Sequence, residues 1–102
     1  PAFKGYRGFP GSICASPNEM VVHGIPGKFK LRKGDILSVD IGVVKDGWVA
    51  DAARTFPVGE VSPVAAKLLD VTRESLDLAI NEFTTSLWQA ILIIIAASFV
   101  AM

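Results

Sequence analysis

The clearest pattern in the chain is a pair of neighbouring segments that suit β-strands, separated by Asp46-Gly47. Residues 36–44 are rich in β-branched side chains, and residues 48–56 have the composition of a second strand. Asp and Gly both tolerate the positive φ angles of a type I′ turn, so the pattern predicts an antiparallel β-hairpin. A two-residue turn pairs Lys45 with Trp48, which sets the register of the whole hairpin.

That register gives the sequence its main candidate site. Asp40 lies opposite Ala53, and Asp51 lies opposite Gly42. Side chains alternate between the faces of a strand, so the two aspartates share one face as diagonal neighbours, with Cα atoms about 7–8 Å apart. Two like charges in an apolar setting favour a cation between them, so the pair predicts half of a metal site. Two solvated aspartates are the alternative, and a one-residue slip of the turn would move Asp51 to the other face.

Two helices are predicted, one on each side of the hairpin in sequence. Ser16-Pro17-Asn18-Glu19 has the pattern of a capping box with proline at the first helical position, which predicts a short helix ending near His23. Ser62-Pro63 predicts the start of a second helix, whose apolar residues recur at helical spacing as far as Ile80. We expect this helix to cover the apolar face of the hairpin, so the predicted fold class is α/β (α+β). That face comprises Leu37, Val39, Ile41 and Val43.

Length and charge limit what the chain can do. The 102 residues form one small domain, and ten basic and ten acidic residues cancel. Basic residues cluster at 28–33, where we expect a solvated connecting loop and no specific nucleic acid. A single cysteine, Cys14, excludes an internal disulfide and fits a reducing compartment. Nothing near Pro1 looks like a signal peptide, so we expect a cytoplasmic protein, of which this chain is a fragment or an excerpt.

The character of the sequence changes after Ile80. Leu87 to Met102 contains only Gln89 and Ser98 as polar residues. A helix of that length spans roughly 24 Å, shorter than the ~30 Å hydrocarbon core of a bilayer. The segment is compatible both with a buried strand or helix and with a marginal membrane tail. The interpretation that we favour is that residues 81–102 do not continue the domain naturally, through a frameshift, a gene-model error or a truncation.

Several motifs together resemble those of type I methionine aminopeptidases. The resemblance covers about residues 1–80 and implies a partial "pita-bread" fold, in which two related halves surround a dinuclear metal centre. We therefore expect residues 1–80 to form part of such a catalytic domain, followed by a separate apolar segment at 81–102. The matching stretches are Gly5–Pro10, Ser12–Glu19, Val22–Pro26, Gly34–Ile36 and Asp40–Phe56.

The resemblance implies roles for the acidic pair and the histidine. Asp40 matches the carboxylate that holds one divalent ion, and Asp51 matches the carboxylate that bridges two. Two ions held in this way activate a water molecule for hydrolysis. His23 matches the catalytic histidine that contacts the substrate near the scissile amide, and it is not expected to be a metal ligand. A structural or surface role is the alternative for a lone histidine.

The resemblance also implies a substrate pocket. Tyr6, Phe9 and Cys14 match the wall that receives the methionine side chain, and Phe3 is a weaker candidate. Aromatic rings and a thiol suit a soft, flexible thioether. Ordinary core packing is the alternative for these residues.

The implied function is removal of the initiator methionine from nascent proteins, near the ribosome, with two ions of Co, Mn, Fe or Zn. The family's remaining ligands, one histidine and two glutamates, come from the other half of the fold. This chain has no second histidine, and no acid follows Glu82. We therefore expect this chain alone to bind metal weakly and to have little or no activity. The alternative is an inactive homologous module, either retained for binding or anchored by its apolar tail, although a membrane partner is not the one we favour. A proline-specific dipeptidase of the same fold is a weaker alternative, because Val22–Pro26 resembles the methionine enzymes better.

Overall fold

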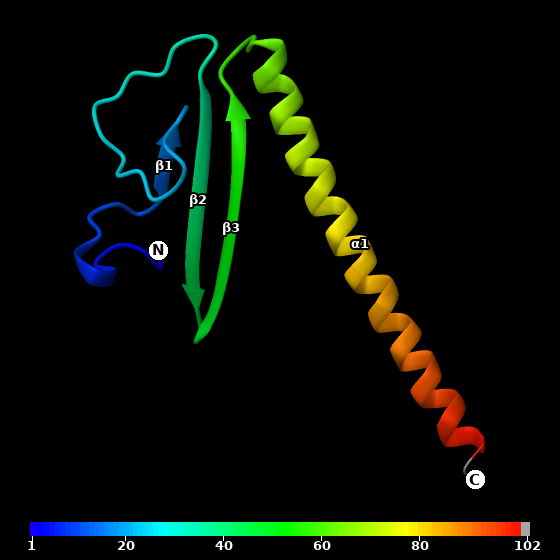
Figure 1. The fold of residues 1–102 in the computed structure, drawn as a ribbon. Coiled ribbons are helices and arrows are strands. Elements are labelled where there is room, and N and C mark those ends of the chain that lie inside the picture. The colour runs from blue at the N-terminus through cyan, green and yellow to red at the C-terminus, as the bar shows by residue number, and fades with distance from the viewer. Residues whose placement is uncertain (101–102) are drawn as a thin grey trace. The chain divides into compact units, whose positions relative to one another are not determined.

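The computed structural model describes the backbone of residues 1–100 and the side chains of residues 1–92. The chain divides into two compact units, Pro1–Ala66 and Lys67–Met102. The first unit contains a sheet, and the second contains most of a long helix (Figure 1). The elements in chain order are the 3-10 helix η1 (Tyr6–Gly8), strands β1 (Cys14–Pro17), β2 (Ile36–Lys45) and β3 (Trp48–Pro57), and helix α1 (Pro63–Val100).

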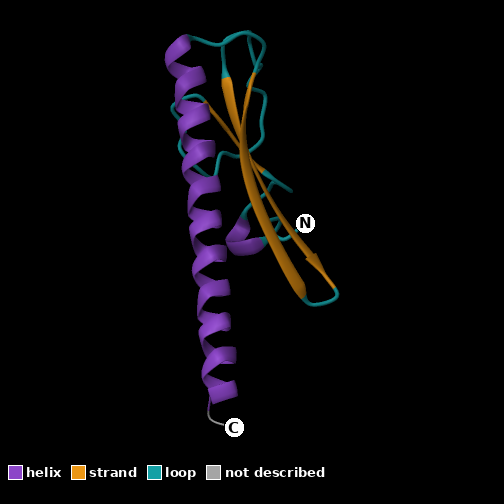
Figure 2. Cartoon of the chain, turned by 90° about the vertical axis from the view of Figure 1, so that its right-hand side faces the viewer, coloured by secondary structure: helices purple, strands orange, loops and turns teal. Residues whose placement is uncertain are grey.

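The three strands form one antiparallel sheet in the order β1-β2-β3. Strands β2 and β3 form the predicted hairpin, and the turn at its end is visible in Figure 2. Asp46 and Gly47 have φ angles of 51° and 82°, as a type I′ turn requires. Lys45 pairs with Trp48, so the predicted register is confirmed over the full length of both strands.

The predicted helix from Pro17 to His23 is wrong. Ser16 and Pro17 are the last residues of β1, where they pair with Ser38 and Leu37. The Ser16 hydroxyl accepts a hydrogen bond from the Gly24 N–H, at 3.0 Å, instead of one from the first turn of a helix. The capping pattern is a local preference, and in this fold a partner eight residues away uses the hydroxyl.

A long loop joins β1 to β2, and a compact set of hydrogen bonds closes it. The Asn18 amide donates to Asp35 at 3.0 Å and accepts from the Ile36 N–H at 3.1 Å. The second oxygen of Asp35 accepts from the Arg32 N–H at 2.8 Å. These bonds bring the two ends of the loop together at the start of β2. The basic residues at 28–33 lie in this loop, as predicted.

The first unit has a small interior centred on β1. Among the described residues, Cys14 and Ser16 are buried, and so are the backbones of Gly24 and Gly42. On the apolar face of the hairpin, Ile41 remains 45% exposed. That α1 covers this face stays a prediction.

Helix α1 begins where the sequence predicts. The Ser62 hydroxyl accepts from the Ala65 N–H at 3.2 Å, and Pro63 is the first helical residue. The helix continues through Ile80 to Val100, so the division of the chain at residue 80 stays a prediction. Among the residues that the structure describes, no helix has a stretch long and apolar enough to cross a membrane. The prediction for Leu87–Met102 falls mostly on side chains outside the described ones.

Candidate metal and substrate site

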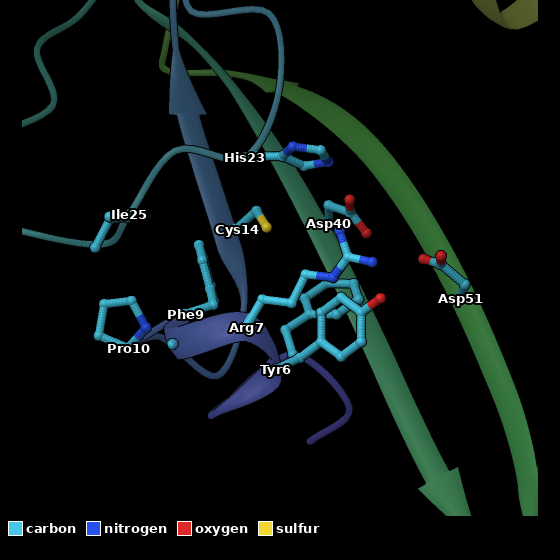
Figure 3. Close-up of a pocket in the computed structure, with 11 residues that line it drawn as sticks. Tyr6, Arg7, Phe9, Pro10, Cys14, His23, Ile25, Asp40 and Asp51 are labelled. Atoms are coloured by element: carbon cyan, nitrogen blue, oxygen red, sulfur yellow. The ribbon is translucent and has the colours of Figure 1, made fainter.

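The sheet, the N-terminal segment and the loop between β1 and β2 line an open cavity of about 640 Å³ (Figure 3). Every site residue predicted from the sequence lies at this cavity, including the weaker candidate Phe3. The lining thus brings together two carboxylates, an imidazole, a thiol and several rings. Its residues are Phe3, Tyr6, Arg7, Gly8, Phe9, Pro10, Cys14, His23, Ile25, Asp40 and Asp51.

The register of the sheet positions the polar side of the cavity. Asp40 pairs with Ala53 on β3, and Asp51 pairs with Gly42 on β2, so both carboxylates project from the same face as diagonal neighbours. On the other side of β2, Asp40 pairs with Cys14 of β1. Residues from all three strands therefore meet at one point of the sheet, as Figure 3 shows.

Asp40 lies in an unfavourable electrostatic environment. Its Oδ1 atom is buried and has no hydrogen-bond partner. Burial raises the pKa of Asp40, and the neighbouring Asp51 carboxylate raises that pKa further, whereas the His23 imidazole lowers it. A buried carboxylate oxygen without a donor is costly, and a bound cation would satisfy it.

Cys14 lies beside the same two carboxylates. Its side chain is buried, and burial is the main cause that raises the pKa of its thiol. The charges of Asp40 and Asp51 raise that pKa further. Cys14 therefore stays a neutral thiol at pH 7 and forms a small, soft part of the wall.

His23 reaches the cavity from the loop between β1 and β2. Its backbone has a φ angle of 59°, in the left-handed region that only a few residue types adopt readily. Figure 3 shows the imidazole beside Asp40, on the opposite side from Phe9 and Pro10. His23 thus lies on the polar side of the cavity, and the residue as a whole is exposed.

The apolar wall comes from residues 3–10. Phe3 packs over Gly42, where an added Cβ atom would lie 2.5 Å from the ring of Phe3. The absence of a side chain at Gly42 therefore leaves room for an aromatic ring on the aspartate face. Tyr6 is 65% exposed and contributes one side of its ring.

Sequence reasoning missed several residues of the lining. Arg7 lies between the aromatic wall and the carboxylates, and its guanidinium is 5.5 Å from the centre of the Tyr6 ring. It reaches this place because its backbone has a φ angle of 48° inside η1. Ile25 and Pro10 close the far end. The glycines at 5 and 8, which flank Arg7, were the available signal for so tight a turn.

The residues present fit part of a divalent metal centre. Two carboxylates on one face, one with a buried unpartnered oxygen, are the hard oxygen donors that such ions accept. In the described part of the chain, no group of three or more His, Cys, Asp or Glu side chains is arranged to hold a metal ion. The cavity therefore presents two carboxylates on one face, which is part of what a divalent metal centre needs.

A hairpin that presents paired carboxylates to a cavity suits the binding of a divalent cation. Residues 3–89 match the family model of metallopeptidase family M24, and the chain belongs to this family. Membership implies the use of divalent metal.

Within that family the chain is similar to methionine aminopeptidases. It is 61% identical to the methionine aminopeptidase of Borreliella burgdorferi over 82 residues, covering 80% of this chain and 33% of that protein. It is 55% identical to methionine aminopeptidase 1 of Bacillus subtilis over 82 residues, which again cover 80% of this chain and 33% of that protein. The crystal structure of the Thermotoga maritima methionine aminopeptidase superposes with a TM-score of 0.75 at 52% identity, covering 78% of this chain and 32% of that one.

These similarities confirm the resemblance and the fold class. The antiparallel sheet and the helix are part of the pita-bread fold. The chain spans about a third of the length of the curated relatives it matches.

Proposed function

We propose that this chain forms part of a metal-dependent aminopeptidase that removes the N-terminal methionine from nascent proteins. The observation that carries this proposal is the meeting of Asp40, Asp51 and His23 with an apolar wall in one cavity. A module that only binds a partner has no need for a buried, unpartnered carboxylate oxygen. We therefore place the inactive binding module second.

In this proposal Asp40 and Asp51 hold the metal. Asp40, with its buried and unpartnered oxygen, and Asp51 beside it would supply the carboxylate oxygens for divalent ions. When bound, divalent ions lower the pKa of a coordinated water and polarise the scissile carbonyl. Mn, Fe, Co and Zn all accept carboxylate ligands, and we propose that the ion is one of these.

The remaining residues bind and orient the substrate. His23 stands beside the carboxylates, where its imidazole donates a hydrogen bond to the oxygen of the scissile amide as charge develops on it. Tyr6, Phe9 and Cys14 receive the methionine side chain, with Phe3 completing the wall. The neutral thiol of Cys14 suits this role, because it adds no charge beside an apolar thioether.

The substrate class sets the place of action. New proteins carry their initiator methionine in the cytoplasm, so we propose a cytoplasmic location near the ribosome. The cavity holds about 640 Å³, which accommodates one methionine side chain together with the peptide bond behind it.

Metal binding by the 102-residue chain is the first test. We expect Mn²⁺ to bind, weakly, and Asp51→Asn to remove the binding, as measured by isothermal titration calorimetry. Asp77→Asn is the matched control, because it makes the same chemical change at an exposed position of α1. Equal binding by all three proteins would contradict the proposed metal ligands.

Activity needs a second test, because this chain supplies two carboxylates. We expect little or no release of methionine from a Met-Ala-Ser peptide by the 102-residue chain with Co²⁺ or Mn²⁺. We then expect release by a chimera in which residues 3–80 replace the matching segment of the Thermotoga maritima enzyme. An Asp51→Asn chimera that folds and remains active would contradict the proposal.

A further inference from the structure

The segment that carries His23 is attached to the edge of β1 by two hydrogen bonds at one residue. The Gly24 carbonyl accepts from the Ala15 N–H at 2.8 Å. The Gly24 N–H donates to the Ser16 hydroxyl at 3.0 Å. Ser16 is only 3% exposed, so water competes little for this bond. The loop is thus fixed to the sheet at the residue directly after His23.

Close packing at Gly24 makes this attachment tight. A Cβ atom at Gly24 would lie 2.1 Å from the Ala15 carbonyl oxygen and 2.7 Å from the Met20 sulfur. The backbone of Gly24 therefore approaches β1 as closely as a neighbouring strand would. His23, one residue earlier, has a φ angle of 59°, a conformation that persists only when its surroundings hold it.

Ser16 belongs to the same face of the sheet as the candidate site. Along β1, Cys14 and Ser16 are two residues apart and project to one side. Cys14 pairs with Asp40, and Ser16 pairs with Ser38. The bond from Ser16 to Gly24 therefore fixes the position of His23 relative to Asp40 through a short and rigid path.

We propose that Ser16 is a positioning residue, whose hydroxyl holds the His23 imidazole over the Asp40/Asp51 site through the backbone of Gly24. Its role in a reaction rests on the proposed function, whereas its effect on the place of His23 does not. Ser16 does not touch the cavity itself, since it is absent from the described lining.

The single histidine of the chain provides a direct reporter. Long-range proton–nitrogen NMR spectra of the 15N-labelled 102-residue chain contain a single set of imidazole signals, that of His23. We compare wild type with Ser16→Ala, with Ser16→Thr, which keeps the hydroxyl, and with Ser38→Ala. Ser38 is the matched control: it pairs with Ser16 in the sheet, but its hydroxyl bonds to Thr55 at 2.8 Å and not to Gly24.

In Ser16→Ala we expect the ring signals of His23 to shift and broaden, and the Gly24 amide to exchange with solvent about tenfold faster. Ser38→Ala should leave both unchanged at similar stability, and Ser16→Thr should restore them. Unchanged His23 signals in a folded Ser16→Ala protein would overturn the inference. So would equal changes in Ser38→Ala, which would indicate a general loosening of the sheet.

A further variant and a metal titration distinguish an effect on folding, and a failure of the proposed function, from the role of Ser16. If Ser16→Ala does not fold, Ser16→Cys replaces it, because the thiol keeps the volume but is a weaker acceptor. If neither folds while Ser38→Ala does, Ser16 is a folding residue and the inference fails. Titration with Mn²⁺ tests the proposed function independently: a wild-type His23 signal that Mn²⁺ does not broaden would count against the metal site, and the comparison of variants without metal would still decide the role of Ser16.

Discussion

Replacing Asp40 with asparagine should stabilise the metal-free chain and abolish its response to metal. The substitution keeps the shape of the side chain and removes its charge. Asp40 and Asp51 face one another as diagonal neighbours, and both the burial of Asp40 and the charge of Asp51 raise the pKa of Asp40. The charged form of Asp40 is therefore a source of instability that a bound cation would relieve.

The sheet geometry sets the size of the effect. The Cα atoms of diagonal neighbours are about 7–8 Å apart, and two unit charges at that spacing would repel by about 0.5 kcal/mol in water and about 2 kcal/mol at an effective dielectric constant of 20. The two carboxyl groups lie closer than their Cα atoms, so these values are lower bounds. The burial of Asp40 adds to the difference in the same direction, because a neutral amide costs less to bury than a charged carboxylate. We expect a gain of about 1 kcal/mol at pH 7, which corresponds to roughly 4–8 °C in Tm for a domain of this size.

Urea unfolding followed by far-UV circular dichroism measures both effects. In EDTA, Asp40→Asn should unfold at a higher urea concentration than wild type. In Mn²⁺, wild type should gain about 2.7 kcal/mol when the ion is at 100 times its Kd, whereas the variant should gain almost nothing. The order of the two stabilities should therefore reverse when metal is added. Asp77→Asn, on the exposed surface of α1, should behave as wild type in both solutions.

The pH dependence of stability independently checks whether the charge of Asp40 destabilises the metal-free chain. Because the folded-state pKa of Asp40 is raised above its ordinary value of 3.8, the folded protein binds the proton more tightly than the unfolded chain. Wild type therefore loses stability as pH rises from that value through the raised pKa, and the advantage of Asp40→Asn should disappear in acid. An Asp40→Asn protein that is less stable than wild type in EDTA at pH 7 would refute this reasoning, as would an equal gain from Mn²⁺ in both proteins.

Two further predictions concern the loop between β1 and β2. Gly24→Ala should lower the free energy of unfolding, measured by thermal melts, by about 1–3 kcal/mol, because the added methyl group would overlap the Ala15 carbonyl. Gly27→Ala is the control and should be nearly neutral, because its methyl group would meet nothing closer than 3.8 Å. Hydrogen bonds to Asp35 lower its pKa, so its stabilisation is present above pH 3.8 and is lost as pH falls through the lowered value. Asp35→Asn should therefore flatten the acid side of the stability profile, and an unchanged profile would contradict the importance of these bonds.

The hairpin could be predicted from the sequence because its determinants are local. Asp46-Gly47 fixes the turn, the turn fixes the register, and the register brings Asp40 and Asp51 to one face. The start of α1 could be predicted for the same reason, since Ser62 caps the helix that follows it directly and bonds to Ala65, three residues later. In each case, the groups that decide the structure are within a few residues of one another.

The loop could not be predicted in the same way. Ser16 and Pro17 have the local pattern of a helix start, but Ser16 bonds to Gly24 and Pro17 pairs with Leu37. Arg7 enters the cavity through a left-handed backbone conformation that no periodicity indicates. The apolar wall was found through family resemblance, because a run of glycines and aromatics does not say which ring faces inward.

The turn at Asp46-Gly47 also determines which genetic changes this segment can absorb. Asp40 and Asp51 are eleven positions apart, and the tip of the hairpin lies well away from both. Substitutions at many strand positions would leave the carboxylates facing each other. A single-codon insertion or deletion in the turn would rotate Asp51 to the opposite face while sparing every site residue. On the proposed function, the number of residues between the two aspartates matters as much to the site as the aspartates themselves.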